Sequence, residues 1–156
     1  MKVNLIAVGK IKEKYFRYAV DEYKKRLSRF CEFTEIEVKE ESFVNEPNES
    51  EKTKILEKEG EEILKKAKGR IIAMCIEGKK HSSLDLSRVI SGQIESGGEI
   101  TFVIGGSYGL SDAVKSVATK KISFSDMTFP HTLFRVMLIE QIYRAFTIIQ
   151  GSNYHK

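Results

Sequence analysis

Three short apolar runs, each followed closely by glycine, constrain the fold of this chain more than any other feature of its sequence. Runs of about six apolar residues bounded by glycine are typical of strands buried on both faces of a parallel sheet. The segments between them carry apolar residues at helical spacing. The three runs are residues 3–8, 71–76 and 100–104. We therefore expect an α/β fold, with a mostly parallel sheet and helices on both faces.

Two weaker strands complete the expected sheet. Thr34, Ile36 and Val38 alternate with glutamates, which indicates a half-exposed strand near a sheet edge. Residues 122–125 form a short run that ends in a loop. No internal repeat and no linker interrupts this alternation, so we expect residues 1–156 to form one domain of ordinary size.

Helix starts are marked by polar residues at characteristic spacing. Asn48 stands three residues before Glu51, and Ser82 stands three residues before Asp85. Each pair resembles a capping box, in which the two residues satisfy each other's free amide groups. Pro130 is expected at the first position of the last helix, where its missing N–H costs nothing.

The last helix, expected from about residue 131 to 150, carries apolar side chains on nearly its whole circumference. A helix that is apolar all round is buried on all sides, yet one sheet face covers only one side. A second copy of the chain is the simplest second cover. We therefore predict a homodimer through this C-terminal helix, most simply with two-fold symmetry.

The net charge of +4, from 26 basic and 22 acidic residues, hides an uneven distribution. Residues 10–29 carry 8 basic and 3 acidic side chains, whereas residues 32–62 carry 12 acidic and 4 basic ones. Phosphate contacts dominate nucleic-acid affinity, so a stand-alone RNA-binding protein is expected to show a larger basic excess. Taken alone, the net charge predicts only a mild preference for anionic partners, and residues 10–29 form one basic face.

The two cysteines, Cys31 and Cys75, have apolar neighbours and no CxxC or Cys/His spacing. This argues against a zinc site, so we expect no metal, and it favours reduced, buried thiols. The opening apolar run is too short for a signal peptide, and no run approaches the roughly 20 apolar residues of a membrane span. We expect a cytoplasmic protein that does not bind a membrane.

A glycine cluster, Gly105-Gly106-Ser-Tyr-Gly109, joins a buried strand to a helix. Small residues there let a ligand approach the backbone, although a simple tight turn explains the pattern too. A nucleotide is the favoured ligand class. The dinucleotide fingerprint places its glycines after the first strand, where this chain has only Gly9, and no Walker motif is present.

The loop before the last helix, residues 124–131, mixes aromatic, Met and hydroxyl side chains. Such a loop can wrap an adenine, or it can simply connect strand and helix and plug the core. Among the polar residues of the helix, Glu140 and Arg144 can pair on one face. Arg135 lies about 180° away from Arg144 by the helical repeat, so each is a candidate for a phosphate contact or a structural ion pair. The tail, Tyr154-His155-Lys156, can stack on a base and contact phosphate, or be frayed.

These motifs together resemble the RlmH family, the YbeA-like branch of the SPOUT methyltransferase superfamily. The resemblance covers essentially the whole chain and rests on a specific combination of segments. The matching segments are Phe102–Gly109, Phe124–His131, Arg135, Glu140–Ala145, Tyr154–Lys156, Leu5–Lys10 and Lys58–Gly60.

The resemblance implies a C-terminal trefoil knot, a homodimer and S-adenosylmethionine bound in the knotted loops. It implies cofactor contacts at Met74, where relatives often have Leu, at Gly105, and along the loop entering the last helix. At the variable position Asp126 it implies a backbone contact rather than a side-chain one. The implied loop residues are Phe124, Ser125, Asp126, Met127, Thr128 and Phe129.

The implied reaction is methylation of N3 of a pseudouridine in the helix 69 loop of 23S ribosomal RNA, on the assembled ribosome. Five residues are candidates for contacts to this RNA: Arg135, Arg144, Tyr154, His155 and Lys156. The catalytic base is left unassigned, with His155 or a residue of the partner subunit as candidates. For this substrate the small net charge favours docking into a preformed ribosomal site recognised by shape, with residues 10–29 as the docking face. Two alternatives stay open, a non-catalytic RNA- or ribosome-binding protein of the same fold and, less well supported by the glycine order, a dinucleotide-dependent oxidoreductase.

Overall fold

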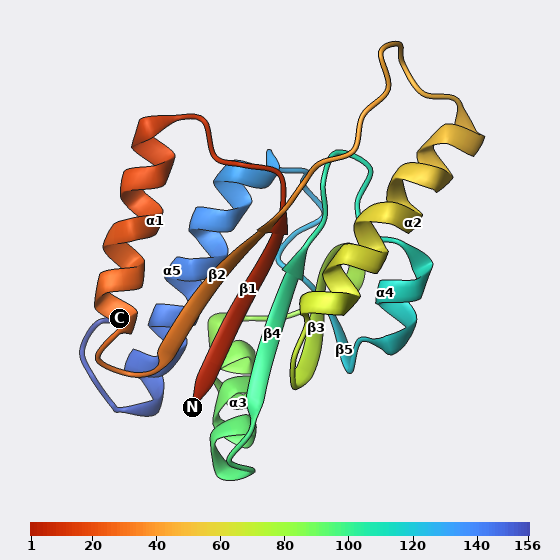
Figure 1. Ribbon diagram of the computed structural model, residues 1–156. Coiled ribbons are helices and arrows are strands. Elements are labelled where there is room, and N and C mark those ends of the chain that lie inside the picture. The colour runs from red at the N-terminus through yellow and green to blue at the C-terminus, as the bar shows by residue number, and fades with distance from the viewer.

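The computed structural model describes all 156 residues and contains one five-stranded sheet in which every strand pair is parallel (Figure 1). The strand order is β2-β1-β4-β3-β5, which confirms the expected α/β fold. The strands are β1 (Lys2–Val8), β2 (Glu32–Val38), β3 (Arg70–Lys80), β4 (Glu99–Ile104) and β5 (Lys120–Ser123). The helices are α1 (Lys14–Leu27), α2 (Glu49–Lys66), α3 (Ser83–Glu95), α4 (Asp112–Val117) and α5 (His131–Ile149).

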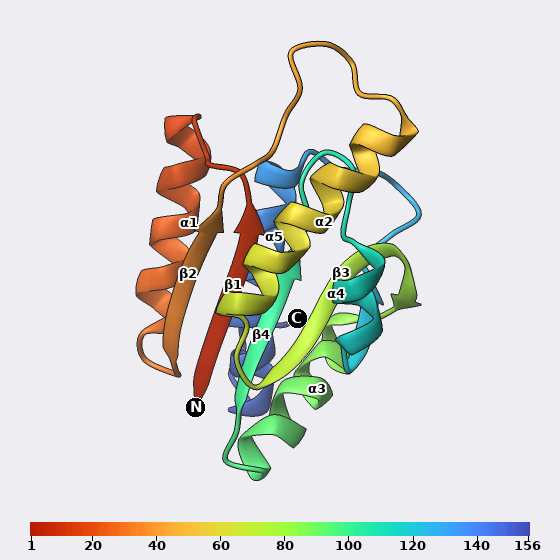
Figure 2. The same cartoon turned by 45° about the vertical axis from the view of Figure 1, so that its right-hand side comes forward.

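Helices cover both faces of the sheet, as predicted, and divide the core in two (Figure 2). The larger cluster packs α1, α3 and α5 against one face, with Phe102 and Ile72 completely buried in it. The smaller cluster packs α2 and α4 against the other face, around Val103 and Ile63. Successive side chains of β4 point to opposite faces of the sheet and pack into the two clusters in turn. Both faces of the strand are therefore buried, which explains its almost wholly apolar sequence.

The predicted helix starts are confirmed at two helices. In α2 and α3 the capping boxes form in both directions, Asn48 with Glu51 and Ser82 with Asp85. At α5 the prediction was off by one position, because Pro130 is the residue that precedes the first helical turn. With φ −53° and ψ 137°, Pro130 has the non-helical backbone of a residue that precedes a helix, and φ near −65° is the value that its ring imposes.

β3 is longer than predicted, and the difference shapes the functional edge of the sheet. Residues 77–80 were expected to follow the strand as a separate segment, but β3 continues to Lys80. Its pairing with β5 shifts register, so that both Met74 and Lys79 lie opposite Ile122 and the residues between them bulge outward. A Cβ on Gly78 would lie 2.6 Å from the Ile122 nitrogen, so the bulge needs glycine.

α5 has one buried side and one mixed side. Leu138, Ile142 and Ala145 are fully buried against the core. On the opposite side Leu133, Val136, Met137 and Ile148 stay half-exposed beside Glu140, Gln141 and Arg144. The outer side of the helix therefore carries both half-exposed apolar residues and these three polar ones. No helix combines the length and the apolar run that a bilayer crossing requires.

Arg135 was a candidate for an RNA contact, and the structure instead places it in the core. The residue is 0% exposed, and its guanidinium donates to Glu35 Oε1 at 3.1 Å, to Glu37 Oε1 at 2.7 Å and to the Gly9 carbonyl at 3.0 Å. Burial would raise the pKa of Glu35, but hydrogen bonds from Arg17, Arg135 and Lys24 bring it below its ordinary value. Arg135 is therefore a structural ion pair between α5, β2 and the end of β1.

We predict that Arg135→Ala destabilises the protein by about 3–5 kcal/mol, because it leaves the buried Glu35 and Gly9 oxygens short of a donor. Arg135→Lys should recover only part of this, since an ammonium cannot span three acceptors as a guanidinium does. Urea denaturation followed by circular dichroism measures the difference. Arg17→Ala, at the half-exposed arginine on the same carboxylates, is the control and should cost about 1 kcal/mol. Equal losses for the two alanine variants would contradict the role given to burial.

Candidate active site

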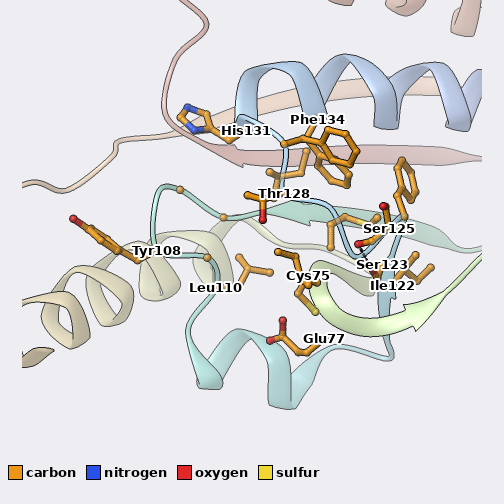
Figure 3. A pocket seen from close by; sticks show the side chains of 18 of the residues that line it. Cys75, Glu77, Tyr108, Leu110, Ile122, Ser123, Ser125, Thr128, His131 and Phe134 are labelled. Carbon is orange, nitrogen blue, oxygen red and sulfur yellow. Dashed lines mark hydrogen bonds between the residues drawn. The ribbon is translucent and has the colours of Figure 1, made fainter.

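A cavity of about 700 Å³ opens at the carboxyl ends of β3, β4 and β5 (Figure 3). Because parallel strands end at the same edge, three loops meet there: the β3 bulge, the glycine loop after β4, and the segment between β5 and α5. Such a crevice outside the strand ends is where open α/β sheets bind ligands. Its size suits a nucleotide-sized molecule.

The glycine loop is a tight turn with backbone packed on backbone. A Cβ on Gly105 would lie 2.2 Å from the Gly109 carbonyl oxygen, so no other residue fits without moving the loop. The Gly109 amide donates to the Gly106 carbonyl at 3.1 Å and closes the turn. The tight turn expected as one reading of the sequence is confirmed, and this turn brings bare backbone to the cavity wall.

The loop from β5 to α5 lines the opposite wall. Ser125 orders it, because its hydroxyl accepts from the Met127 amide at 3.0 Å while its carbonyl accepts from the Ser123 hydroxyl at 2.9 Å. The Phe124 ring packs against Phe134 of α5 with 5.0 Å between the ring centroids. The predicted residues that line the cavity are Met74, Gly105, Phe124, Ser125, Met127, Thr128 and Phe129.

Asp126 is the one predicted cofactor residue whose side chain is not in the cavity wall. It forms an ion pair with Lys80, and its side chain is 78% exposed. A backbone contact of Asp126 to the cofactor stays a prediction. The structure therefore gathers seven of the eight predicted cofactor residues around one cavity and turns the eighth outward.

The sequence analysis missed two charged residues of the cavity, Glu77 and Lys115. They form an ion pair between the β3 bulge and α4, and the hydrogen bond from Lys115 lowers the pKa of Glu77. Cys75, predicted as a buried structural thiol, is free and half-buried and lines the same wall. Burial and the Glu77 charge raise its pKa, which keeps it a thiol. The only signal in the sequence was Gly78, which marks the bulge.

A further residue that the sequence analysis did not place at the site, Glu59 of α2, lies beneath the glycine loop. It falls on the apolar stripe of its helix, between Ile55 and Ile63, and is only 3% exposed. Its Oε1 accepts from the Glu41 amide at 3.0 Å, and a Cβ on Gly106 would lie 3.4 Å from its Oε2. Neighbouring Glu40 accepts from the Ser107 hydroxyl at 2.7 Å. Burial, helped by the charges of Glu40 and Glu41, raises the pKa of Glu59 to about 7.

Glu59→Gln should make the protein more stable at neutral and alkaline pH. The folded protein holds the Glu59 proton up to about pH 7, whereas the unfolded chain releases it near the ordinary glutamate pKa of about 4.3. The stabilisation that Glu59 contributes is therefore complete below pH 4.3 and is lost as pH rises through 7. Glutamine keeps the acceptor for Glu41 and never ionises. The variant should gain on the order of 2 kcal/mol over the parent at pH 8 and almost nothing at pH 4.

Urea denaturation at several pH values measures this gain. Glu57→Gln, at an exposed position of the same helix, is the matched control and should show no such trend. A gain for Glu59→Gln that is the same at pH 4 and pH 8 would exclude the buried charge as its cause.

The remaining candidates for RNA contact gather away from the cavity, on the outer side of α5. The Tyr154 hydroxyl and the Arg144 guanidinium both donate to Glu140 Oε1, at 3.1 Å and 2.6 Å. Arg144 also lies over the Tyr154 ring at 4.8 Å, and His155 and Lys156 are exposed beside it. Arg144 is 13 residues along α5 from cavity-lining His131, about 20 Å by the helical rise. The tail is thus docked on its own helix and does not line the cavity of the same chain.

Comparisons with known proteins agree with this arrangement. A family model described as "Predicted SPOUT methyltransferase" matches residues 1–155. The chain is 49% identical to ribosomal RNA large subunit methyltransferase H of Clostridium tetani and 50% identical to a putative protein of the same name from Methanococcus maripaludis, over the full length of each.

Solved structures share the fold at low sequence identity. A probable methylase family protein from Haemophilus influenzae superposes with a TM-score of 0.58 at 10% identity, over 99% of this chain and 70% of that one. A putative methyltransferase from Legionella pneumophila, solved with its cofactor SAM, gives 0.50 at 11% identity over 93% and 66%.

Proposed function

The chain belongs to the SPOUT methyltransferase family, and on that premise we propose that it methylates large-subunit ribosomal RNA with S-adenosylmethionine as methyl donor. The observation that carries this proposal is the single cavity where Met74, Gly105 and the 124–129 loop meet. These are the positions that the family pattern assigns to the cofactor, and they come from three segments far apart in the sequence.

The cavity has the features that an adenosine-sized ligand needs. Gly105 supplies backbone without a side chain, so a ligand can lie directly against the turn. Met74, Phe124 and Phe129 supply apolar walls, while Ser125 keeps the loop backbone in one conformation. S-adenosylmethionine, when bound, supplies an already activated methyl group. The task left to these residues is to orient the reactants and exclude water.

For the acceptor we propose N3 of a pseudouridine in the helix 69 loop of 23S ribosomal RNA, methylated on the assembled ribosome in the cytoplasm. The likeness to proteins named large subunit methyltransferase H supports the RNA, and the family pattern supports the nucleotide. The modest net charge favours a preformed ribosomal surface over free RNA.

We propose that two copies of the chain pair through α5. Its outer side leaves Leu133, Val136 and Met137 half-exposed in one chain. The tail that carries Tyr154 and His155 lies about 20 Å along the helix from its own cavity. A two-fold partner would cover the apolar side and bring its tail toward the cavity of the first chain. Arg144, Tyr154, His155 and Lys156 would then contact the RNA beside the cofactor.

The trefoil knot is part of the same proposal. β5 lies at the sheet edge beyond β3, and the chain then returns across the sheet to α5, which packs between α1 and α3 (Figure 1). The returning segment 124–130 runs past the β3 bulge and the glycine loop, since all three line one cavity. A path of this kind is what threading of the C-terminal segment requires.

We expect Gly105→Ala to abolish or greatly weaken binding of S-adenosylmethionine, because the new Cβ would meet the Gly109 carbonyl and displace the cavity wall. Gly92→Ala, at a glycine of α3 with no atom within 4 Å of the added Cβ, is the control and should bind normally. Calorimetry with S-adenosylmethionine and with NAD tests both variants and the parent. Tight binding of NAD alone would favour an oxidoreductase.

The function itself is tested in cells by mass spectrometry of 23S ribosomal RNA from a strain that lacks the gene. We expect the methyl group on the helix 69 pseudouridine to be lost and to return when the parent gene, but not Gly105→Ala, is restored. If the RNA keeps its methyl group while the protein still binds ribosomes, the chain is a non-catalytic ribosome-binding protein.

A further inference from the structure

We infer that the start of α1 and the loop before it form a separate RNA-docking surface, which holds the ribosomal RNA while the target base enters the cavity. This surface, called the α1 tip below, consists of Lys10, Lys12, Lys14, Tyr15 and Tyr18. The inference rests on the proposed function and adds to it the part of the surface that binds the substrate outside the cavity.

The structure divides the basic residues of segment 10–29 into two groups. Arg17 and Lys24 are used within the protein, since Arg17 donates to Glu35 at 2.8 Å and to Glu37 at 2.9 Å, and Lys24 donates to Glu35 at 3.2 Å. Arg26 pairs with Glu22 at 2.8 Å. None of the three lysines of the α1 tip has an acidic partner within 4.0 Å, and all three are exposed. The unpaired cations of this face therefore form two groups, three lysines at the α1 tip beside the cavity and Lys25 with Arg29 toward the other end of the helix.

Two solvent-exposed tyrosines lie close to these lysines in the sequence. Tyr15 is 68% exposed and Tyr18 is 76% exposed, the two most exposed aromatic side chains of the protein. Being three residues apart on α1, they lie on neighbouring parts of one helix face. The Tyr15 ring packs edge-on against Phe16 at 4.6 Å, which limits its freedom. Exposed aromatic rings beside lysines are the combination that stacks on unpaired bases while the cations contact the phosphates.

The α1 tip lies at the same edge of the sheet as the cavity. β1 is the direct neighbour of β4 and parallel to it, so the loop after β1 and the glycine loop leave the sheet side by side (Figures 1 and 2). A Cβ on Gly9 would lie 3.3 Å from Nε2 of His131, a residue of the cavity wall. Lys10 follows Gly9 directly, so the cationic segment begins at the rim of the cavity. An RNA loop whose base enters the cavity can place its flanking nucleotides on the α1 tip.

The charges favour RNA over a second copy of the chain as the occupant of this surface. A two-fold contact centred on the α1 tip would bring two sets of three unpaired lysines together. Like charges repel, and the two copies of half-buried Glu13, between Lys12 and Lys14, would offset only part of the six lysine charges. A polyanion gains from the same arrangement, because each phosphate contact releases counterions.

The test compares Lys12→Gln/Lys14→Gln with the matched control Lys25→Gln/Arg29→Gln, which removes two exposed and unpaired cations from the other end of α1. Binding is measured to ribosomes from the strain that lacks the gene, as a function of salt. Loss of two phosphate contacts should weaken binding roughly tenfold or more near 0.1 M salt and reduce the salt slope by about 1.5. The control should change neither by more than about twofold.

A second variant, Tyr15→Ala/Tyr18→Ala, tests the stacking and should raise KM for ribosomes about tenfold while leaving kcat nearly unchanged. Calorimetry with S-adenosylmethionine should give the parent value for every variant. Light scattering should show the parent oligomeric state.

The inference is overturned if the tip and control variants weaken binding equally, or if neither weakens it. It is equally overturned if the tyrosine variant changes the oligomeric state, which would make the tip a contact between copies. These outcomes differ from a failure of the proposed function, in which the parent protein itself does not bind S-adenosylmethionine or methylate ribosomes.

Discussion

The buried guanidinium of Arg135 connects the parts of the molecule on which the site depends. From the start of α5 it donates to two carboxylates of the edge strand β2 and to the carbonyl of Gly9, the residue that follows β1. Directly before α5 runs the loop that forms one cavity wall, and directly after Gly9 begins the α1 tip. One side chain with three acceptors thus links the segment that leads into the cavity with the segment that leads into the surface proposed to hold the RNA. Its Nε has no hydrogen-bond partner, so the buried charge depends on these three contacts, and their loss on local opening would be costly.

This network also changes the meaning of the charge pattern. The acidic stretch after α1 is not a uniform repulsive surface, because Glu35 and Glu37 form ion pairs with half-exposed Arg17 and buried Arg135, and Glu35 also pairs with Lys24. Three of the five basic side chains that remain free in this segment lie at the cavity end of α1, together with two exposed tyrosines. A protein with a small net charge can therefore still have a strongly positive local patch. Such a patch suits the recognition of one structured RNA site.

The proposed cofactor site is built within a single small domain. Parallel strands bring their carboxyl ends to one edge, and each contributes one specialised loop. The β3 bulge adds Cys75 and the Glu77–Lys115 pair, the β4 loop adds bare backbone, and the β5–α5 loop adds apolar walls. Beneath the glycine loop, Glu59 is held in a place where its charge is costly near neutral pH. That cost is tolerated because its oxygen orders the Glu41 backbone beside the loop.

The sequence by itself determined the order of strands and helices, the two helix caps and the parallel sheet. These follow from local patterns, since apolar periodicity reports burial and parallel strands must end at a common edge. The choice of Met74, Gly105 and the 124–129 loop as cofactor positions came from the family resemblance, and the structure brings these segments to one cavity. Only the tertiary structure decided what Arg135, Glu59 and Cys75 do. Arg135 finds its carboxylates about 100 residues away, as given by the separations of 100 and 98 positions to Glu35 and Glu37. Glu59 and Cys75 depend likewise on segments that pack against them from elsewhere. No local pattern encodes a partner at that distance, so whether a polar side chain is solvated, paired or buried is settled only when the chain packs.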